Sequence, residues 1–107
     1  MKKLTKTLLK FNFNGLDITK VAKIEFAFSQ FKGEKPKKKA VYPGADTVGL
    51  GDSVVGVIWT PQETTLFEAD KYLYADTRIT MKDTEYQPET DILKLEMKPT
   101  LFEEGAV

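Results

Sequence analysis

Apolar and polar residues alternate along much of this chain, which is the pattern of half-buried β-strands. The alternation is clearest in residues 22–29, where every second residue is apolar and the residues between them include Lys23 and Glu25. A register shift of one residue would bury both charges, so the register of this strand is strongly specified. Its predicted inward face comprises Ala22, Ile24, Phe26 and Phe28.

Two further segments alternate in the same way. Residues 9–13 place Leu9, Phe11 and Phe13 on one face, and residues 72–81 form a longer strand rich in aromatic and β-branched residues. The predicted inward residues of the longer strand are Leu73, Ala75, Thr77, Ile79 and Met81. Shorter strands are predicted at residues 40–42, 47–48 and 92–97.

Residues 54–59 are apolar without interruption, which predicts a strand buried on both faces. The residues that follow have the chemistry of a helix start. Thr60 can cap a helix, Pro61 has no N–H to leave unpaired, and Glu63 can accept a hydrogen bond from the cap residue. Because a strand pattern resumes soon afterwards, we predict only one short helical turn, near residues 61–68.

These segments together predict an all-β fold of about seven short strands, in a single domain that spans residues 1–107. The strands should be antiparallel, since the helical turn is too short to be a parallel crossover connection. Two core strands joined by such a turn are typical of a sandwich, where the corner passes the chain from one sheet to the other. We therefore expect an immunoglobulin-like antiparallel β-sandwich.

The composition argues against an enzyme. The chain contains neither Cys nor His, so it lacks the commonest general base, the thiol nucleophile and the thiolate metal ligand. Its acidic residues do not have the regular spacing of a calcium loop, and Gly49 and Gly51 lack the rest of a phosphate-binding motif. We predict no catalytic residues, no cofactor and no metal site.

The net charge is zero, but the charges are unevenly distributed. Residues 1–40 contain eleven Lys and three acidic residues, a balance of +8, whereas residues 41–107 have a balance of −8. Either the loops happen to be basic early and acidic late, or the folded molecule has two oppositely charged faces that favour head-to-tail association. The basic part lacks the interleaved aromatic and Arg residues of a base-stacking surface, so no nucleic-acid partner is expected.

Residues 31–39 form a low-complexity, Lys-rich segment around Gly33 and Pro36. The default interpretation is a connecting loop at the end of the sandwich, and the alternative is a contact with a polyanion or a membrane surface. The candidate contact residues in this segment are Lys35, Lys37, Lys38 and Lys39.

The predicted outer face of the 72–81 strand is the other candidate interface. It carries Tyr72, Tyr74, Asp76 and Arg78, and Tyr and Arg are enriched at interface anchors because they offer a large area with a polar end. The structural alternative is that Asp76 pairs with Arg78 on the sheet surface while the tyrosines cover an edge. Trp59 is predicted to belong to the core.

Residues 58–67, Ile-Trp-Thr-Pro-Gln-Glu-Thr-Thr-Leu-Phe, precede a Tyr-x-Tyr-x-Asp-x-Arg strand. This segment resembles the T-x-x-E-T-x-x-F corner of small β-sandwich proteins encoded in phages and prophages of Gram-positive bacteria. Residues 17–19, the strand over residues 23–30 and the last Leu-rich strand fit in the same order, so the resemblance covers most of the chain. The first sandwich domain of tail baseplate or receptor-binding proteins is similar in outline. The resemblance implies a non-enzymatic virion or accessory protein and supplies no catalytic residues.

We therefore expect a structural or assembly protein of a phage particle, a component of the tail, that acts through contacts with other phage structural proteins or with itself. The alternative is a free-standing binding module for carbohydrate or a cell-surface partner. The start of the chain lacks the apolar segment of a secretion signal, and no stretch approaches the roughly 20 apolar residues of a transmembrane helix. The expected location is the virion, after synthesis in the bacterial cytoplasm.

Overall fold

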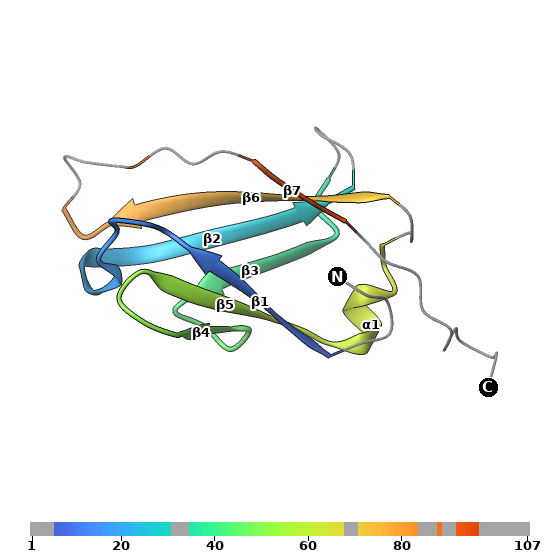
Figure 1. Ribbon diagram of the computed structural model, residues 1–107, viewed down its shortest axis with the longest axis horizontal. Helices are drawn as coiled ribbons and strands as arrows, with labels where there is room; N and C mark the ends of the chain where they lie inside the picture. The colour runs from blue at the N-terminus through green and yellow to red at the C-terminus, as the bar shows by residue number, and fades with distance from the viewer. Residues whose placement is uncertain (1–5, 31–34, 68–70, 84–87, 89–91, 97–107) are drawn as a thin grey trace.

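The computed structural model describes residues 6–30, 35–67, 71–83, 88 and 92–96. These residues form seven strands in two antiparallel sheets that pack face to face, which confirms the predicted all-β sandwich (Figure 1). The strands are β1 Thr7–Asn12, β2 Val21–Ser29, β3 Lys38–Tyr42, β4 Thr47–Gly49, β5 Val54–Trp59, β6 Tyr72–Met81 and β7 Leu93–Glu96. One sheet has the order β1-β5-β4 and the other has the order β3-β2-β6-β7.

The strand connectivity is immunoglobulin-like. Sequential strands pair as β2–β3, β4–β5 and β6–β7, whereas the pairs β1–β5 and β2–β6 join segments that are far apart in the sequence. The same pairings occur among strands B, C, C′, D, E, F and G of the immunoglobulin fold, with B-E-D in one sheet and C′-C-F-G in the other. The residues that the structure describes contain no counterpart of the outermost strand A.

The inner face of β2 agrees with the prediction except at the start of the strand. Ala22 is exposed, and Val21 is buried in its place. The pairing of β2 with β6 shifts register between Val21 and Lys23, so Ala22 is the extra residue of a β-bulge. The predicted inward position of Ala22 is therefore wrong, whereas the three larger residues of that face are buried as predicted.

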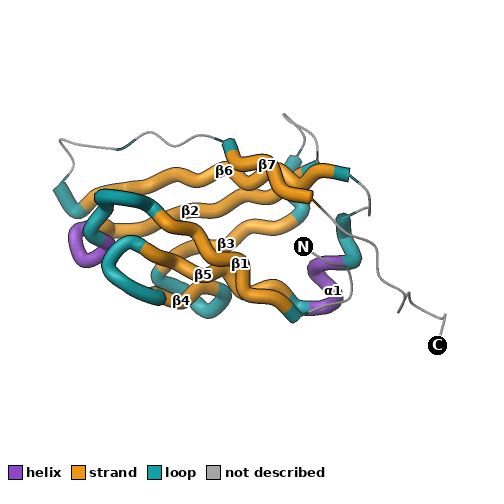
Figure 2. The backbone as a smooth tube through the Cα atoms, viewed as in Figure 1, coloured by secondary structure: helices purple, strands orange, loops and turns teal. Residues whose placement is uncertain are grey.

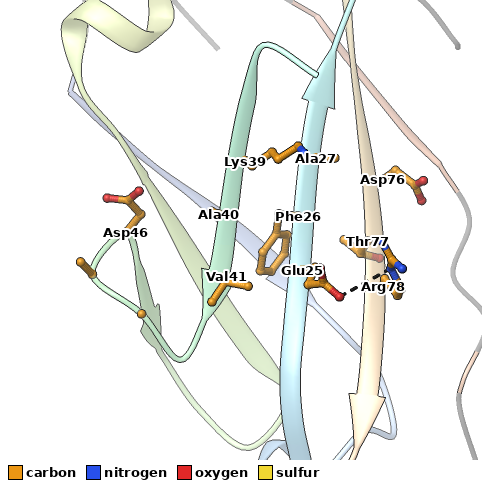
Figure 3. A pocket seen from close by; sticks show the side chains of 12 residues that line it. Glu25, Phe26, Ala27, Lys39, Ala40, Val41, Asp46, Asp76, Thr77 and Arg78 are labelled. Atoms are coloured by element: carbon orange, nitrogen blue, oxygen red, sulfur yellow. Dashed lines mark ion pairs between the residues drawn. The ribbon is translucent and has the colours of Figure 1, made fainter. Parts of the chain in front are cut away.

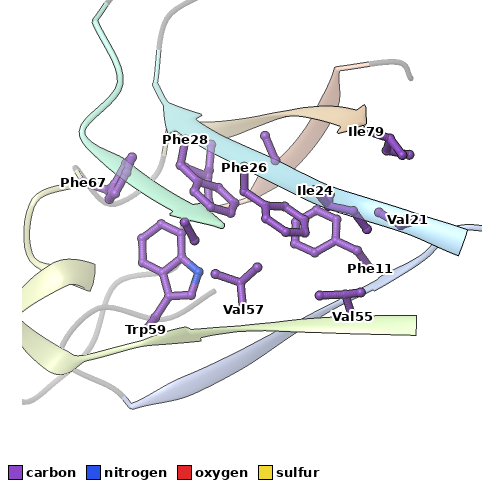
Figure 4. Close-up of a cluster of buried hydrophobic side chains, with 13 residues drawn as sticks. Phe11, Val21, Ile24, Phe26, Phe28, Val55, Val57, Trp59, Phe67 and Ile79 are labelled. Atoms are coloured by element: carbon purple, nitrogen blue, oxygen red, sulfur yellow. The ribbon is translucent and has the colours of Figure 1, made fainter. Parts of the chain in front are cut away.

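A row of aromatic rings fills the space between the two sheets (Figure 4). Phe11 of β1 meets Phe26 of β2 with 5.0 Å between ring centroids, and Phe28 of β2 meets Trp59 of β5 edge-on at 4.8 Å. Phe67, which follows the helical turn, lies 5.3 Å from Trp59 and completes the row. Tilted and edge-on ring pairs add about 0.5–1.5 kcal/mol each to the free energy gained by burial.

Strand β5 is covered by the other sheet on its inner face only. Val55, Val57 and Trp59 point inward and are fully buried, as predicted. Val54 and Ile58 point outward and are half-buried, so burial on both faces is incomplete in the described part of the chain.

Strand β3 begins earlier than its predicted bounds of 40–42. Lys38 and Lys39 were expected at the end of a connecting loop, and this expectation is wrong because both residues continue the ladder with β2. Lys38 lies opposite Phe28 and Lys39 lies opposite Ala27. Backbone pairing with a neighbouring strand outweighs the low strand propensity of Lys. Residues 31–34 of the predicted loop lie outside the described residues.

The corner between β5 and β6 contains the predicted capped turn, α1 (Pro61–Thr64), at one end of the sandwich (Figure 2). The Glu63 N–H donates to Thr60 Oγ1 at 3.2 Å, and the Thr60 N–H donates to Glu63 Oε1 at 2.9 Å. These two hydrogen bonds form a capping box, with Pro61 at the first helical position, as the sequence predicts. A second short helix, η1 (Ile18–Lys20), was not predicted; the Asp17 side chain caps it.

Replacing Phe26 tests the aromatic row. Phe26→Ala is expected to lower the free energy of unfolding by roughly 3–5 kcal/mol, because the substitution leaves a cavity between the sheets. Urea denaturation followed by circular dichroism measures the loss. Val41→Ala on the neighbouring strand, where the side chain is 42% exposed, is the control and should change stability by less than about 0.5 kcal/mol. A loss well under 1 kcal/mol for Phe26→Ala would contradict its place in the core.

Replacing Thr60 tests the capped corner. Thr60→Ala removes the side-chain acceptor for the Glu63 N–H and is expected to lower the free energy of unfolding by about 1 kcal/mol. Gln62→Ala changes an exposed side chain in the same turn and serves as the matched control. Equal melting temperatures for Thr60→Ala and the wild type would show that the cap does not stabilise this corner.

Candidate functional site

The outer face of the four-stranded sheet carries most of the residues that the sequence singled out. We call this surface the charged face; its strands are β3, β2, β6 and β7. Tyr72, Tyr74, Asp76 and Arg78 all belong to it, because the alternate residues Leu73, Ala75 and Ile79 are buried on the inner side of β6. The predicted facing of this strand is therefore confirmed.

The pairing register brings side chains from three strands together on the charged face. Ala27 of β2 lies between Lys39 of β3 and Asp76 of β6. Two residues before Ala27 on β2, Glu25 lies between Val41 of β3 and Arg78 of β6. The small side chain of Ala27 leaves a depression between its two charged neighbours, so the face is not flat.

A hollow of about 450 Å³ opens over this part of the sheet (Figure 3). Its floor is formed by β2, and its walls are formed by the outer residues of β3 and β6 together with the turn that carries Gly44, Ala45 and Asp46. The side chains of Lys39, Asp46 and Asp76 line it without forming an ion pair within the described residues. Both signs of charge are therefore available for contact with a partner.

Arg78 pairs with a residue of the neighbouring strand. Arg78 Nε lies 3.5 Å from Glu25 Oε1, and Lys23 Nζ lies 3.6 Å from the same oxygen. The alternative that Arg78 pairs with Asp76 is not what the structure shows. Ion pairs this exposed contribute about 0–1 kcal/mol, so the Arg78 guanidinium can exchange Glu25 for a partner at little cost.

Tyr72 provides an exposed aromatic surface at the edge of the charged face. The residue is 51% exposed, and Lys94 Nζ of β7 lies 3.7 Å from the centroid of its ring. A cation over a ring at this distance is attracted by the negative face of the aromatic system. Lys94 was not identified from the sequence, because only the pairing of β6 with β7 places it beside a tyrosine.

The four candidate lysines of the predicted basic loop do not form one patch. Lys35 is exposed, and Lys37 donates to Gln30 Oε1 at 3.3 Å while its ammonium lies over the ring of Phe67. Lys39 points outward and lines the hollow. Lys38 points inward, with its side chain only 2% exposed, so its assignment to an exposed contact surface is wrong.

Lys38 connects β3 to the capped corner. Its Nζ donates to Glu63 Oε2 at 2.5 Å and lies 5.2 Å from the centroid of the Trp59 ring. Burial by itself raises the pKa of Glu63, but the hydrogen bonds from Lys38 and from the Thr60 N–H, with the charge of Lys38, hold that pKa below its ordinary value of 4.5. This pair is structural, since it faces the interior.

The site's chemistry suits binding. Within the described residues no group of three or more acidic, His or Cys side chains is placed to hold a metal ion. No helix there is long and apolar enough to cross a membrane. The charged face offers carboxylates, cations and an exposed tyrosine on rigid strands, which are the features of a contact surface.

The Lys38–Glu63 pair predicts an acid-dependent loss of stability. The pKa of Glu63 is lower in the folded chain than in the unfolded chain, so its contribution is complete above the unfolded value and is lost as the pH falls through the folded value. We expect the difference in unfolding free energy between wild type and Glu63→Gln to shrink on acidification. Urea titrations at a series of pH values measure it, with Gln62→Ala as a control that carries no carboxyl change. A difference that grows with acidification would contradict this assignment.

Comparison with known proteins adds no relative: no family model, no curated protein and no solved structure matches the chain.

Proposed function

We propose that this chain is a non-enzymatic structural or assembly protein of a phage or prophage, a component of the tail or baseplate, that acts through protein–protein contacts. The contact surface is the charged face. The observation that carries the proposal is an exposed Tyr72 on the same rigid sheet as Lys39 and Asp76, which form no ion pair within the described residues. The phage context is supported by the resemblance of residues 58–67 and the strand after them to the corner of phage-encoded sandwich proteins.

The charged face has the ingredients of an interface anchor. Tyr72 and Arg78 present large exposed side chains, and neither is held by strong internal contacts. Lys39 and Asp76 flank Ala27 with opposite charges, so a partner with complementary charges would be oriented in one direction across the strands. Such an arrangement favours a specific partner over nonspecific adhesion.

A binding module for carbohydrate is the second candidate. The hollow supports it, because Glu25, Asp46 and Asp76 supply acceptors for sugar hydroxyl groups and Lys39 supplies a donor. This candidate predicts a monomer whose Tyr fluorescence changes when a sugar is added, since Trp59 is buried in the core. The assembly candidate predicts no such response.

The assembly proposal is tested by measuring the affinity of the chain for purified phage tail and baseplate proteins. Tyr72→Ala and Arg78→Ala should each weaken binding to the partner protein about tenfold or more, because large Tyr and Arg side chains carry much of the binding energy of an interface. Lys10→Ala, an exposed cation on the opposite sheet, is the matched control and should bind as the wild type does. Isothermal titration calorimetry gives the affinities.

Mass spectrometry of purified particles provides a second measurement. The chain should be retained in particles from wild-type phage and lost from particles that carry Tyr72→Ala with Arg78→Ala. Unchanged incorporation and unchanged affinity of both variants would overturn the charged face as the contact surface. A fluorescence response to sugar without any binding to tail proteins would favour the carbohydrate module.

A further inference from the structure

The outer face of the three-stranded sheet has a different chemistry from the charged face. Five aliphatic side chains point outward from β1, β5, and from β4 and the residue that follows it. They are Leu8, Val48, Leu50, Val54 and Ile58. We call this surface the aliphatic face. Three of its residues are among the exposed large hydrophobic residues: Leu8 at 41%, Val48 at 37% and Leu50 at 43%.

The aliphatic side chains gather around Gly56 at the centre of β5. A Cβ at Gly56 would lie 2.7 Å from Cδ1 of Leu8 and 3.1 Å from Cδ1 of Leu50, so both leucines lean over the glycine from opposite sides. Val54 and Ile58 flank it along β5. Because the glycine has no side chain, the patch is continuous and low in relief, as a surface that packs against another sheet must be.

An antiparallel sheet that faces water on one side normally carries polar residues there. Strand β5 instead has apolar residues on both sides, the pattern of a strand covered by protein on both faces. The four-stranded sheet covers its inner face, and the described part of the chain leaves its outer face uncovered. The outer side of β5 is therefore the apolar surface of the described residues that a partner would cover.

We propose that the aliphatic face is covered by the aliphatic face of a second copy of this chain, in a symmetric dimer. A partner for this surface must be aliphatic and must not place a cation against Lys10, which points outward from β1 beside Gly56. Of the two sheet faces that the structure describes, the charged face is not aliphatic. The aliphatic face meets both requirements when the Lys10 side chains of the two copies are kept apart. The best complement available within the molecule is therefore the same face.

The pairing register supports a symmetric arrangement. Lys10 and Val48 both lie opposite Gly56, on the two sides of β5. A two-fold axis over β5 and parallel to it places Lys10 of each copy opposite Val48 of the other, so the two cations do not meet. Val54 and Ile58 then lie near the axis, so each of them meets the same residue of the other copy. This is the self-complementary contact that a two-fold axis creates.

The size of the face sets the expected strength of the dimer. Strands β1 and β5 are about 20 Å long and β4 is about 10 Å long, and with a spacing of about 5 Å they give a footprint of roughly 250 Å². A standard stable interface buries about 800 Å² on each partner, so this contact alone gives a weak, concentration-dependent dimer. Fixing several copies on one particle would raise their effective concentration and strengthen the same contact.

Sedimentation equilibrium on the whole chain tests the proposal. Between about 10 μM and about 1 mM, the average mass should rise from the monomer value of 12.1 kDa towards twice that value, equally at low and high salt. Leu8→Glu and Leu50→Glu should each keep the chain monomeric. Val41→Glu introduces the same charge at an equally exposed position of the charged face, 42% against 41% and 43%, and should associate as the wild type does.

Chemical crosslinking gives a second measurement that does not depend on charged variants. The chain has no cysteine, so single-cysteine variants can be joined only between copies. Ile58→Cys, near the proposed axis, should give a crosslinked dimer with a short bismaleimide, whereas Thr80→Cys, half-buried on the charged face, should not. Circular dichroism confirms that both variants are folded.

The outcomes separate this proposal from the proposed function. A monomer at every concentration, together with equal crosslinking of both cysteine variants, would overturn the dimer and leave the charged face untouched. Association that Val41→Glu removes and Leu8→Glu preserves would also overturn it, since the contact would then lie on the charged face. Loss of tail-protein binding in Tyr72→Ala with an unchanged dimer would support both proposals independently.

Discussion

The sandwich depends on the aromatic row between its two sheets. Phe11 and Trp59 come from one sheet and Phe26 and Phe28 come from the other, so each contact across the row joins segments that are distant in the sequence. Phe67 extends the row to the corner that returns the chain to the four-stranded sheet. These rings fix the distance and the relative orientation of the sheets, and both outer faces are presented in fixed positions as a result.

The ion pair between the buried Lys38 and the half-buried Glu63 extends this constraint to the end of the molecule. Glu63 accepts from the Thr60 N–H with one oxygen and from Lys38 with the other, so one carboxylate joins the capped turn to the edge strand β3. Lys38 is thereby withdrawn from the surface, and its neighbour Lys39 is directed into the hollow. The alternation of a strand, rather than the high local density of lysines, decides which of them can meet a partner.

The two outer faces of the sandwich suggest two different kinds of contact. The charged face combines Tyr72 with ions of both signs and is suited to a specific, oriented partner. The aliphatic face around Gly56 is suited to a copy of itself. Because the two faces lie on opposite sides of one rigid core, a contact at one face leaves the other face accessible.

Local pattern in the sequence was enough to predict the β-sandwich, the capped turn at Thr60–Glu63, the inner faces of β2 and β6, and the outward position of Tyr72 and Arg78. These features depend on the two-residue period of side chains along a strand or on hydrogen bonds between residues three apart in the sequence. Only the tertiary structure decided the bulge at Ala22, the partner of Arg78 and the burial of Lys38. It also decided that basic residues from the first part of the chain lie beside acidic residues from the second part. The halves with balances of +8 and −8 interleave, since β2 from the first half pairs with β6 from the second. The reason is physical: strand pairing and sheet packing join residues that are distant in the sequence, and a local pattern of apolar and polar residues does not specify which strands become neighbours.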